Sequence, residues 1–264
     1  MRRTTLTALC LAATTAVALT GCSGGDDTDQ AAKSDKAAAS SATATPRAKE
    51  PFPGLSAGEI VDKAFEATTA ARSVRVKGDM RDDTTGGPLT IDLALDKKGD
   101  CVGTLSADGG KTDLIKTGGT VYMRYDEAFL RAQMKGEPAE DVEAAVDMLA
   151  GTWTTTAEDS EASEIGDLCD LDTLLGDDTG TAGETSSATR GATTTVGGSP
   201  ALALQEKDGG ETATLYVATE GTPYVLRIDN RSADEAGSLL FSDYDEPVAA
   251  EKPAGEILDL DNLG

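Results

Sequence analysis

The chain has 264 residues and carries 23 basic against 47 acidic residues, which gives a formal net charge of −24 at pH 7. A surface this acidic excludes a protein that follows nucleic-acid phosphates, because basic side chains supply that affinity. The sequence contains no histidine, which excludes the histidine-dependent serine, cysteine and zinc hydrolases and leaves enzymes built from carboxylates alone.

The first 21 residues have the features of a bacterial signal peptide. A positive start, Met1-Arg2-Arg3, precedes an apolar run at residues 6–19, which is too short to remain as a membrane-spanning helix. The run leads into Leu19-Thr20-Gly21-Cys22, which resembles the lipobox of bacterial lipoproteins. The resemblance implies cleavage before Cys22, acylation of that cysteine, and a lipid anchor on the extracytoplasmic face of the cell membrane. The alternative is an ordinary signal peptide with an incidental cysteine, and the export route, Sec or twin-arginine, stays open.

The composition changes after the predicted cleavage site. Residues 23–50 contain no Ile, Leu, Val or aromatic residue and consist mainly of small and polar types. Such a segment cannot bury enough apolar surface to offset its loss of conformational entropy. We therefore predict a lipidated cysteine and disordered tether at residues 22–50, followed by one folded domain at residues 51–264.

The four cysteines separate by position. Cys10 leaves with the signal peptide and Cys22 receives the lipid, so Cys101 and Cys169 remain as a pair. An exported protein is exposed to oxidising conditions, which predicts a Cys101–Cys169 disulfide that closes a long loop. The alternative is two reduced, buried thiols.

The folded part opens with a predicted helix. Ser56 and Glu59 have the spacing of a capping box, and Ile60, Ala64 and Ala67 repeat at helical spacing to about residue 71. Segments that alternate apolar and polar residues follow, joined by tight turns, and each predicts a strand. These strands cover residues 74–80, 89–96, 101–107, 112–117 and 121–125.

A helical section interrupts the strands. Asp126 is a predicted N-cap for a short helix, a second helix covers residues 139–149 and ends before Gly151, and Leu168 to Leu175 mark another short helix. Residues 176–190 are polar and glycine-rich, which predicts a loop. Strands resume at residues 192–196, 201–205, 212–218, 224–229 and 238–244. Strands, then helices, then strands favour a single antiparallel α+β domain.

Several of these segments resemble a known family. They are Ser73-Val74-Arg75-Val76-Lys77-Gly78, Leu215-Tyr216-Val217, Gly221-Thr222-Pro223-Tyr224, and the stretch Leu239-Leu240-Phe241-Ser242-Asp243-Tyr244-Asp245-Glu246-Pro247-Val248. With the lipobox, the tether and the first helix, they resemble the LppX/LprG family of actinobacterial lipoproteins over most of residues 55–250. The resemblance implies a LolA/LolB-like lipid-binding fold, in which a curved antiparallel sheet forms an unclosed half-barrel and helices cover its concave face.

The same resemblance implies an apolar cavity, between sheet and helices, that holds the acyl chains of lipids or glycolipids. The candidate lining residues are inward strand positions and apolar helix faces, namely Ile91, Leu93, Phe129, Val142, Val146, Leu215, Leu226 and Phe241. The alternative for each of them is an ordinary solid core, because apolar strand faces are usually just packed.

Two acidic clusters are candidate calcium sites, since oxygen-rich groups bind that ion. They are Asp167, Asp170 and Asp172 beside Cys169, and Asp243, Asp245 and Glu246 near the C-terminus. Neither has the spacing of a known calcium loop, so we favour solvated faces and predict no metal and no cofactor. Two carboxylates can also serve a glycosidase as acid and base, but the sequence places no two of them together.

These features lead to three hypotheses. The first is a non-catalytic, membrane-tethered lipoprotein that binds and also carries acylated lipids or glycolipids. The second is a protein-interaction or sensory lipoprotein with a solid core, no lipid ligand and a membrane-protein partner, and the third is a carboxylate-based enzyme. A connected apolar cavity with a mouth favours the first, and an exposed apolar patch over a packed interior favours the second.

Overall fold

The computed structural model describes residues 50–81, 87–155, 165–175, 188–208, 211–231 and 236–260. These residues belong to one compact unit, Lys49–Gly264. The predicted signal peptide, Cys22 and all of the tether before residue 50 lie outside the described residues. Within the described ranges, no helix is long and apolar enough to span a bilayer.

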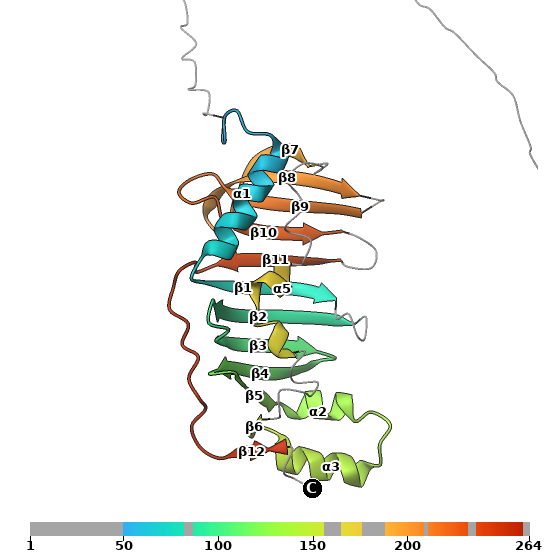
Figure 1. Ribbon diagram of the computed structural model, residues 1–264. Helices are drawn as coiled ribbons and strands as arrows, with labels where there is room; N and C mark the ends of the chain where they lie inside the picture. Colours follow the sequence, from blue (N-terminus) through green and yellow to red (C-terminus); the bar gives the residue numbers. More distant parts are fainter. Residues whose placement is uncertain are drawn as a thin grey trace, which may run out of the picture. The chain divides into compact units, whose positions relative to one another are not determined.

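The described strands form one open sheet (Figure 1). Their bounds are β1 Ser73–Arg81, β2 Pro88–Asp96, β3 Cys101–Ala107, β4 Gly110–Thr117, β5 Thr120–Tyr125, β6 Trp153–Thr155, β7 Thr189–Val196, β8 Ser199–Asp208, β9 Glu211–Ala218, β10 Val225–Asn230, β11 Gly237–Ser242 and β12 Ile257–Asp259. The spatial order is β12-β6-β5-β4-β3-β2-β1-β11-β10-β9-β8-β7. Neighbouring strands are antiparallel except β12, which pairs with β6 in parallel, so the sheet is mixed.

Two meanders meet at the centre of this sheet. Strands β1 to β6 follow one another along one half, and β7 to β11 follow one another along the other. They join where β1 pairs with both β2 and β11, which places Val76 opposite Leu93 on one side and opposite Phe241 on the other. All three side chains are buried, so the apolar face continues across the junction.

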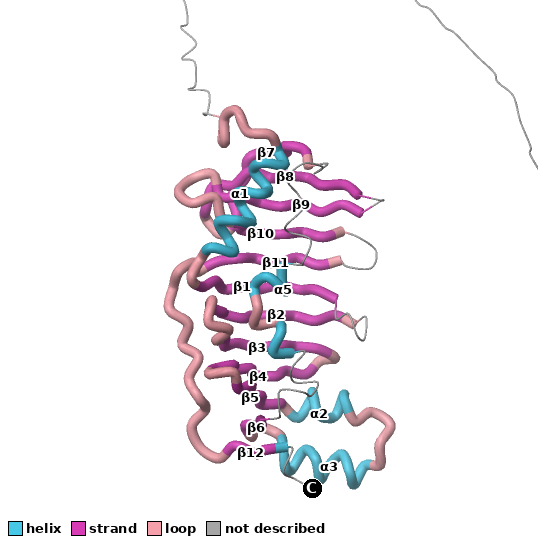
Figure 2. The backbone as a smooth tube through the Cα atoms, in the orientation of Figure 1, coloured by secondary structure: helices cyan, strands magenta, loops and turns pink. Residues whose placement is uncertain are grey.

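Besides a single helical turn at residues 165–167, four described helices accompany the sheet. Their bounds are α1 Ala57–Ala70, α2 Glu127–Gln133, α3 Ala139–Leu149 and α5 Leu171–Leu175. Helix α1 packs on β7, β9 and β10, whereas α2 packs on β4 and α3 packs on α2. Figure 2 shows α1 across one half of the sheet, α5 in front of its middle, and α2 with α3 beyond β5.

The core lies on the face that α1 and the segment 165–175 cover, which we call the concave face. Alternation places Ile91, Leu93 and Leu95 on this face, where each is at most 1% exposed. The opposite face of the same strands carries ion pairs, such as Arg75 with Asp92 at 2.6 Å and Lys77 with Asp92 at 3.2 Å. One apolar and one charged face are the expected outcome of the period-2 pattern.

The predicted fold class, an α+β domain with an open, curved sheet, is confirmed, and the sheet is antiparallel as predicted except for the parallel pair of β6 and β12. Three details differ. The short strands β6 and β12 were not predicted, and β7 begins at Thr189, inside the stretch predicted as a loop. Helices α2 and α3 lie at one end of the sheet and do not cross its middle.

Candidate functional site

Helix α1 forms one cover of the concave face, and its N-terminal end is held by a single arginine. Ser56 and Glu59 form the predicted capping box, with Glu59 N–H donating to Ser56 Oγ at 3.2 Å. Just before the helix, the guanidinium of Arg190 on β7 donates to the carbonyl oxygens of Pro51, Phe52 and Leu55 at 3.0, 2.7 and 2.7 Å. This fixes the chain entering α1 against the edge strand of the sheet.

The C-terminal half of α1 is held by a buried threonine. Thr68 is fully buried, and its Oγ1 accepts a hydrogen bond of 2.9 Å from the N–H of Val225, the first residue of β10. The Thr68 hydroxyl also lies 3.5 Å from the hydroxyl of Tyr244, which donates to the Val225 carbonyl. Both backbone groups at the start of β10 are therefore satisfied by side chains, as buried polar groups require.

Two tyrosines stack beside this contact. The rings of Tyr224 and Tyr244 are nearly parallel, with centroids 3.9 Å apart. Tyr224 donates its hydroxyl to Asp245 at 3.0 Å. Burial raises the pKa of Tyr244, and burial together with the neighbouring Asp245 carboxylate raises the pKa of Tyr224. Both rings therefore stay neutral and act as packing and hydrogen-bonding groups.

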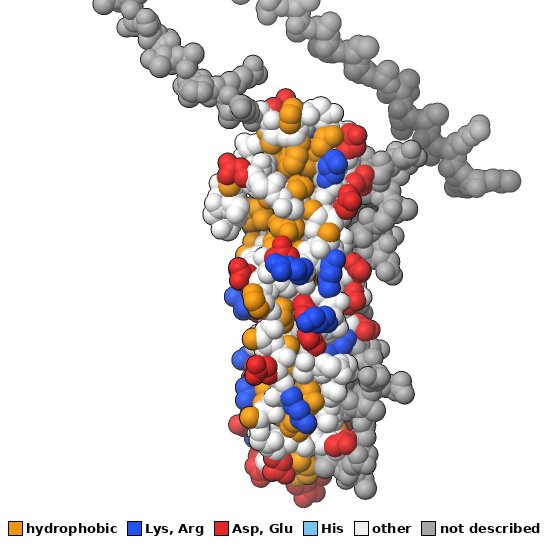
Figure 3. Space-filling model, turned by 60° about the vertical axis from the view of Figure 1, so that its left-hand side comes forward, with side chains coloured by type: hydrophobic (Ala, Val, Ile, Leu, Met, Phe, Trp, Pro, Cys, Tyr) orange, Lys and Arg blue, Asp and Glu red, His pale blue; other side chains and the backbone are white. Residues whose placement is uncertain are grey.

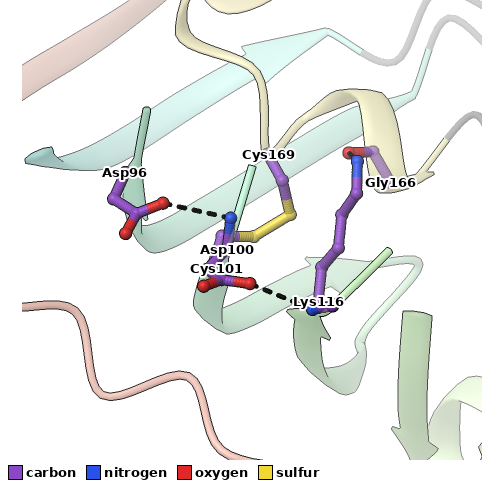
Figure 4. Close-up of a disulfide and its surroundings, with 7 residues drawn as sticks. Asp96, Asp100, Cys101, Lys116, Gly166 and Cys169 are labelled. Carbon is purple, nitrogen blue, oxygen red and sulfur yellow. Dashed lines mark hydrogen bonds between the residues drawn. A yellow bond between two sulfur atoms is a disulfide. The ribbon is translucent and has the colours of Figure 1, made fainter. Parts of the chain in front are cut away.

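The segment 165–175 forms the second cover, over β1 to β4. The predicted Cys101–Cys169 disulfide is present, with a Cα–Cα distance of 5.6 Å, and it ties the segment to the start of β3. Lys116 on β4 adds a second tie, because its ammonium donates to the Gly166 carbonyl at 3.1 Å (Figure 4). Leu168, Leu171 and Leu174 pack on the core but stay partly exposed.

A groove opens at the end of the sheet half that α1 covers. The turn between β7 and β8, the loop between β9 and β10, and the end of β11 enclose about 610 Å³. Its apolar lining includes Val196, Ala218, Tyr224, Leu226, Leu240 and Phe241. This volume lies in the usual range for a small-molecule site. Figure 3 shows hydrophobic side chains gathered on the upper half of the face that carries these strand ends.

Phe241 connects the groove to the interior. Its side chain is 2% exposed, belongs to the buried core of the concave face, and also forms part of the groove wall. Tyr244 likewise packs on the core and lines the groove. Leu240, which also lines the groove, pairs in register with Lys77 of β1 and Arg227 of β10 and so lies on the charged face. The groove therefore lies at the strand ends, where the apolar and the charged face of the sheet meet.

Comparisons with known proteins bear on this arrangement. No family model matches the sequence, and no curated protein matches it. The structure is similar to the lipoprotein LppX of Mycobacterium tuberculosis, with a TM-score of 0.51 and 14% identity over 74% of this chain and 98% of that one. It is also similar to LprF of Mycobacterium bovis, with a TM-score of 0.52 and 17% identity over 78% and 99% of the two chains.

The fold is LppX/LprG-like. At these identities the likeness establishes the architecture, namely an open half-barrel with helical covers on its concave face, and it agrees with the family resemblance of the sequence.

In this LppX/LprG-like structure, the eight predicted cavity residues lie in three different places. Ile91, Leu93 and Leu215 are buried in the core of the concave face. Leu226 and Phe241 line the groove. Phe129, Val142 and Val146 lie on α2 and α3, at the end of the sheet, where the Phe129 ring stacks on Tyr125 with centroids 5.2 Å apart. Four of the eight, Ile91, Leu93, Leu215 and Phe241, therefore belong to the buried core of the concave face. Leu226 lines the groove without belonging to that core, and the three helical residues lie in neither place.

The two acidic clusters have structural roles that sequence reasoning missed. Asp170 caps α5 by accepting from the Thr173 N–H at 3.0 Å. Asp245, for which we favoured a solvated face, accepts from the backbone N–H of Arg72 at 2.8 Å and pairs with its guanidinium at 3.3 Å. These contacts hold the pKa of Asp245 below its usual range. Within the described ranges, no group of three or more acidic or cysteine side chains is placed to hold a metal ion.

Proposed function

We propose that this chain is a non-catalytic, membrane-anchored lipoprotein that binds acylated lipids or glycolipids on the concave face of its half-barrel and carries them at the membrane surface. The groove is the observation that carries this proposal. It has the volume of a ligand site, it lies at the strand ends beside the concave face, and its lining includes two predicted cavity residues, Leu226 and the core residue Phe241.

The covers support the same proposal. Helix α1 is held to the sheet at its two ends, by Arg190 and Thr68, and the segment 165–175 is held by one disulfide and one hydrogen bond. The leucines of that segment stay partly exposed. Helix α1 also buries Ile60, Val61 and Ala64 in the core. The segment 165–175, with its partly exposed leucines and its two ties, is therefore the cover that suits the admission of a long apolar ligand.

The first experiment is native mass spectrometry of residues 49–264, secreted by a bacterial host so that the disulfide forms. The expected result is a reproducible mass excess that organic solvent extracts as an acylated lipid. A mass that stays bare when diacyl lipids are offered refutes lipid binding. That result would favour the second hypothesis, in which the protein is a protein-interaction module with a solid core.

A matched pair of variants places the ligand. Leu226→Asn changes a half-buried side chain of the groove, and Val142→Asn changes a half-buried side chain of α3 outside it. Loss of one leucine contact of about 1.5 kcal/mol weakens binding about tenfold. We expect lower lipid occupancy for the first variant and wild-type occupancy for the second.

Anchoring through Cys22 has its own test in the full chain. The wild-type protein is expected in the membrane fraction, with an N-terminal peptide whose mass includes a diacylglyceryl group on Cys22. Cys22→Ser is expected to abolish that modification. An unmodified, soluble wild-type protein refutes the lipid anchor.

A further inference from the structure

The polar rim of the groove carries charge of one sign. Glu220, in the loop between β9 and β10, and Asp243, just after β11, both line it and are both exposed. Among the described residues that line the groove there is no lysine or arginine. The ligand's polar end therefore meets two carboxylates and no cation of the lining.

The basic side chains next to the groove lining are ion-paired. Arg75 and Lys77 of β1 stand opposite Ser242 and Leu240 of the lining and both pair with Asp92, at 2.6 and 3.2 Å. Arg72 lies 3.3 Å from Asp245, and Arg227 lies 2.6 Å from Asp229, with which it shares the Ser238 hydroxyl. Neither lines the groove. The formal net charge of −24 adds a repulsive field of the same sign as the rim.

We propose that Glu220 and Asp243 make the groove selective for acylated ligands whose polar end carries no negative charge. This inference rests on the proposed function. It assumes that the acyl chain of a ligand contacts the apolar lining of the groove and that the polar head of the same ligand lies at the rim. An anionic head is rejected by Coulomb repulsion, an uncharged head is accepted, and a cationic head is attracted.

Three single-chain probes separate head charge from chain length. Oleyl alcohol, oleylamine and oleate share one apolar chain and differ in head charge, so titration calorimetry at pH 8, below the critical micelle concentration, compares the heads alone. At low ionic strength we expect the alcohol to bind about tenfold tighter than oleate, since each carboxylate contributes a few-fold repulsion. The amine is expected to bind at least as tightly as the alcohol, and added salt is expected to reduce both differences.

The double variant Glu220→Gln, Asp243→Asn tests the assignment to the rim. It is expected to bring oleate to within about twofold of the alcohol without weakening the alcohol. Asparagine suits position 243, where the backbone has a φ of 51°. Glu140→Gln with Asp147→Asn on α3 is the control, because it removes the same two charges away from the groove and is expected to leave the preference intact.

The outcomes distinguish the inference from the proposed function. Binding of none of the three probes overturns the proposed function. Binding of all three with equal affinity, or tighter binding of oleate, leaves lipid binding standing and overturns the charge selectivity. An equal effect of the α3 control overturns the assignment to Glu220 and Asp243, because net charge then explains the preference.

Discussion

Removal of the Cys101–Cys169 disulfide gives the most direct test of how the second cover is held. The bridge joins residues 68 positions apart. On the loop-entropy model, opening a loop of that length lowers the free energy of unfolding by about 4 kcal/mol, because the unfolded chain regains the freedom that the bridge removed. Replacing both cysteines with alanine keeps the site apolar, which suits side chains that are at most 1% exposed.

The assay is urea unfolding of residues 49–264 followed by far-ultraviolet circular dichroism, in the wild type and in Cys101→Ala, Cys169→Ala. A matched control is Lys116→Met, which removes the other tie to the segment while the loop stays closed. It is expected to cost about 1 kcal/mol. A loss below about 1 kcal/mol for the double variant refutes the reasoning, because the loop then contributes no constraint in the unfolded chain.

Two further predictions concern polar contacts of the sheet. Thr68→Val leaves the buried N–H of Val225 without its acceptor and is expected to lower the free energy of unfolding by about 1–3 kcal/mol, with Thr68→Ser as the near-neutral control in the same unfolding assay. Burial opposes ionisation of Asp113, but hydrogen bonds from Lys111 and Arg124 outweigh it and hold its pKa below the usual range. Its stabilising contribution is therefore present above about pH 4 and is lost as the pH falls below that value. The melting temperature of Asp113→Asn is expected to fall less steeply than that of the wild type between about pH 4 and pH 2, and parallel curves contradict this.

Local sequence signals predicted much of the fold. Capping residues act within one turn, so Ser56 with Glu59 and Asp126 gave the starts of α1 and α2, where Asp126 Oδ1 accepts from the Phe129 N–H at 2.7 Å. Strict alternation at residues 89–96 gave β2 and its buried face. Cysteine count and export gave the disulfide.

Features that depend on distant parts of the chain were missed. Strands β6 and β12 are three residues long and pair in parallel across about a hundred residues, so neither carries a periodic pattern of its own. Arg190 lies in a glycine-rich polar stretch. The residues around it in the sequence give no sign that its guanidinium donates to three carbonyl oxygens within residues 51–55, which are far away in the chain. Phe129, Val142 and Val146 have helical apolar spacing, but spacing alone does not say which surface a helix covers.

The contact of Arg190 with the chain before α1 has a mechanical consequence. Tension on residues before Pro51 reaches the three carbonyl contacts first, and from there passes through the arginine into β7 and the hydrogen bonds that join it to β8. Helix α1 follows these contacts in the chain, so while they hold they take up part of that load before it reaches the helix. A pulling force on the segment before α1 therefore acts on the edge strand β7 and its hydrogen bonds to β8 as well as on the first turn of the helix.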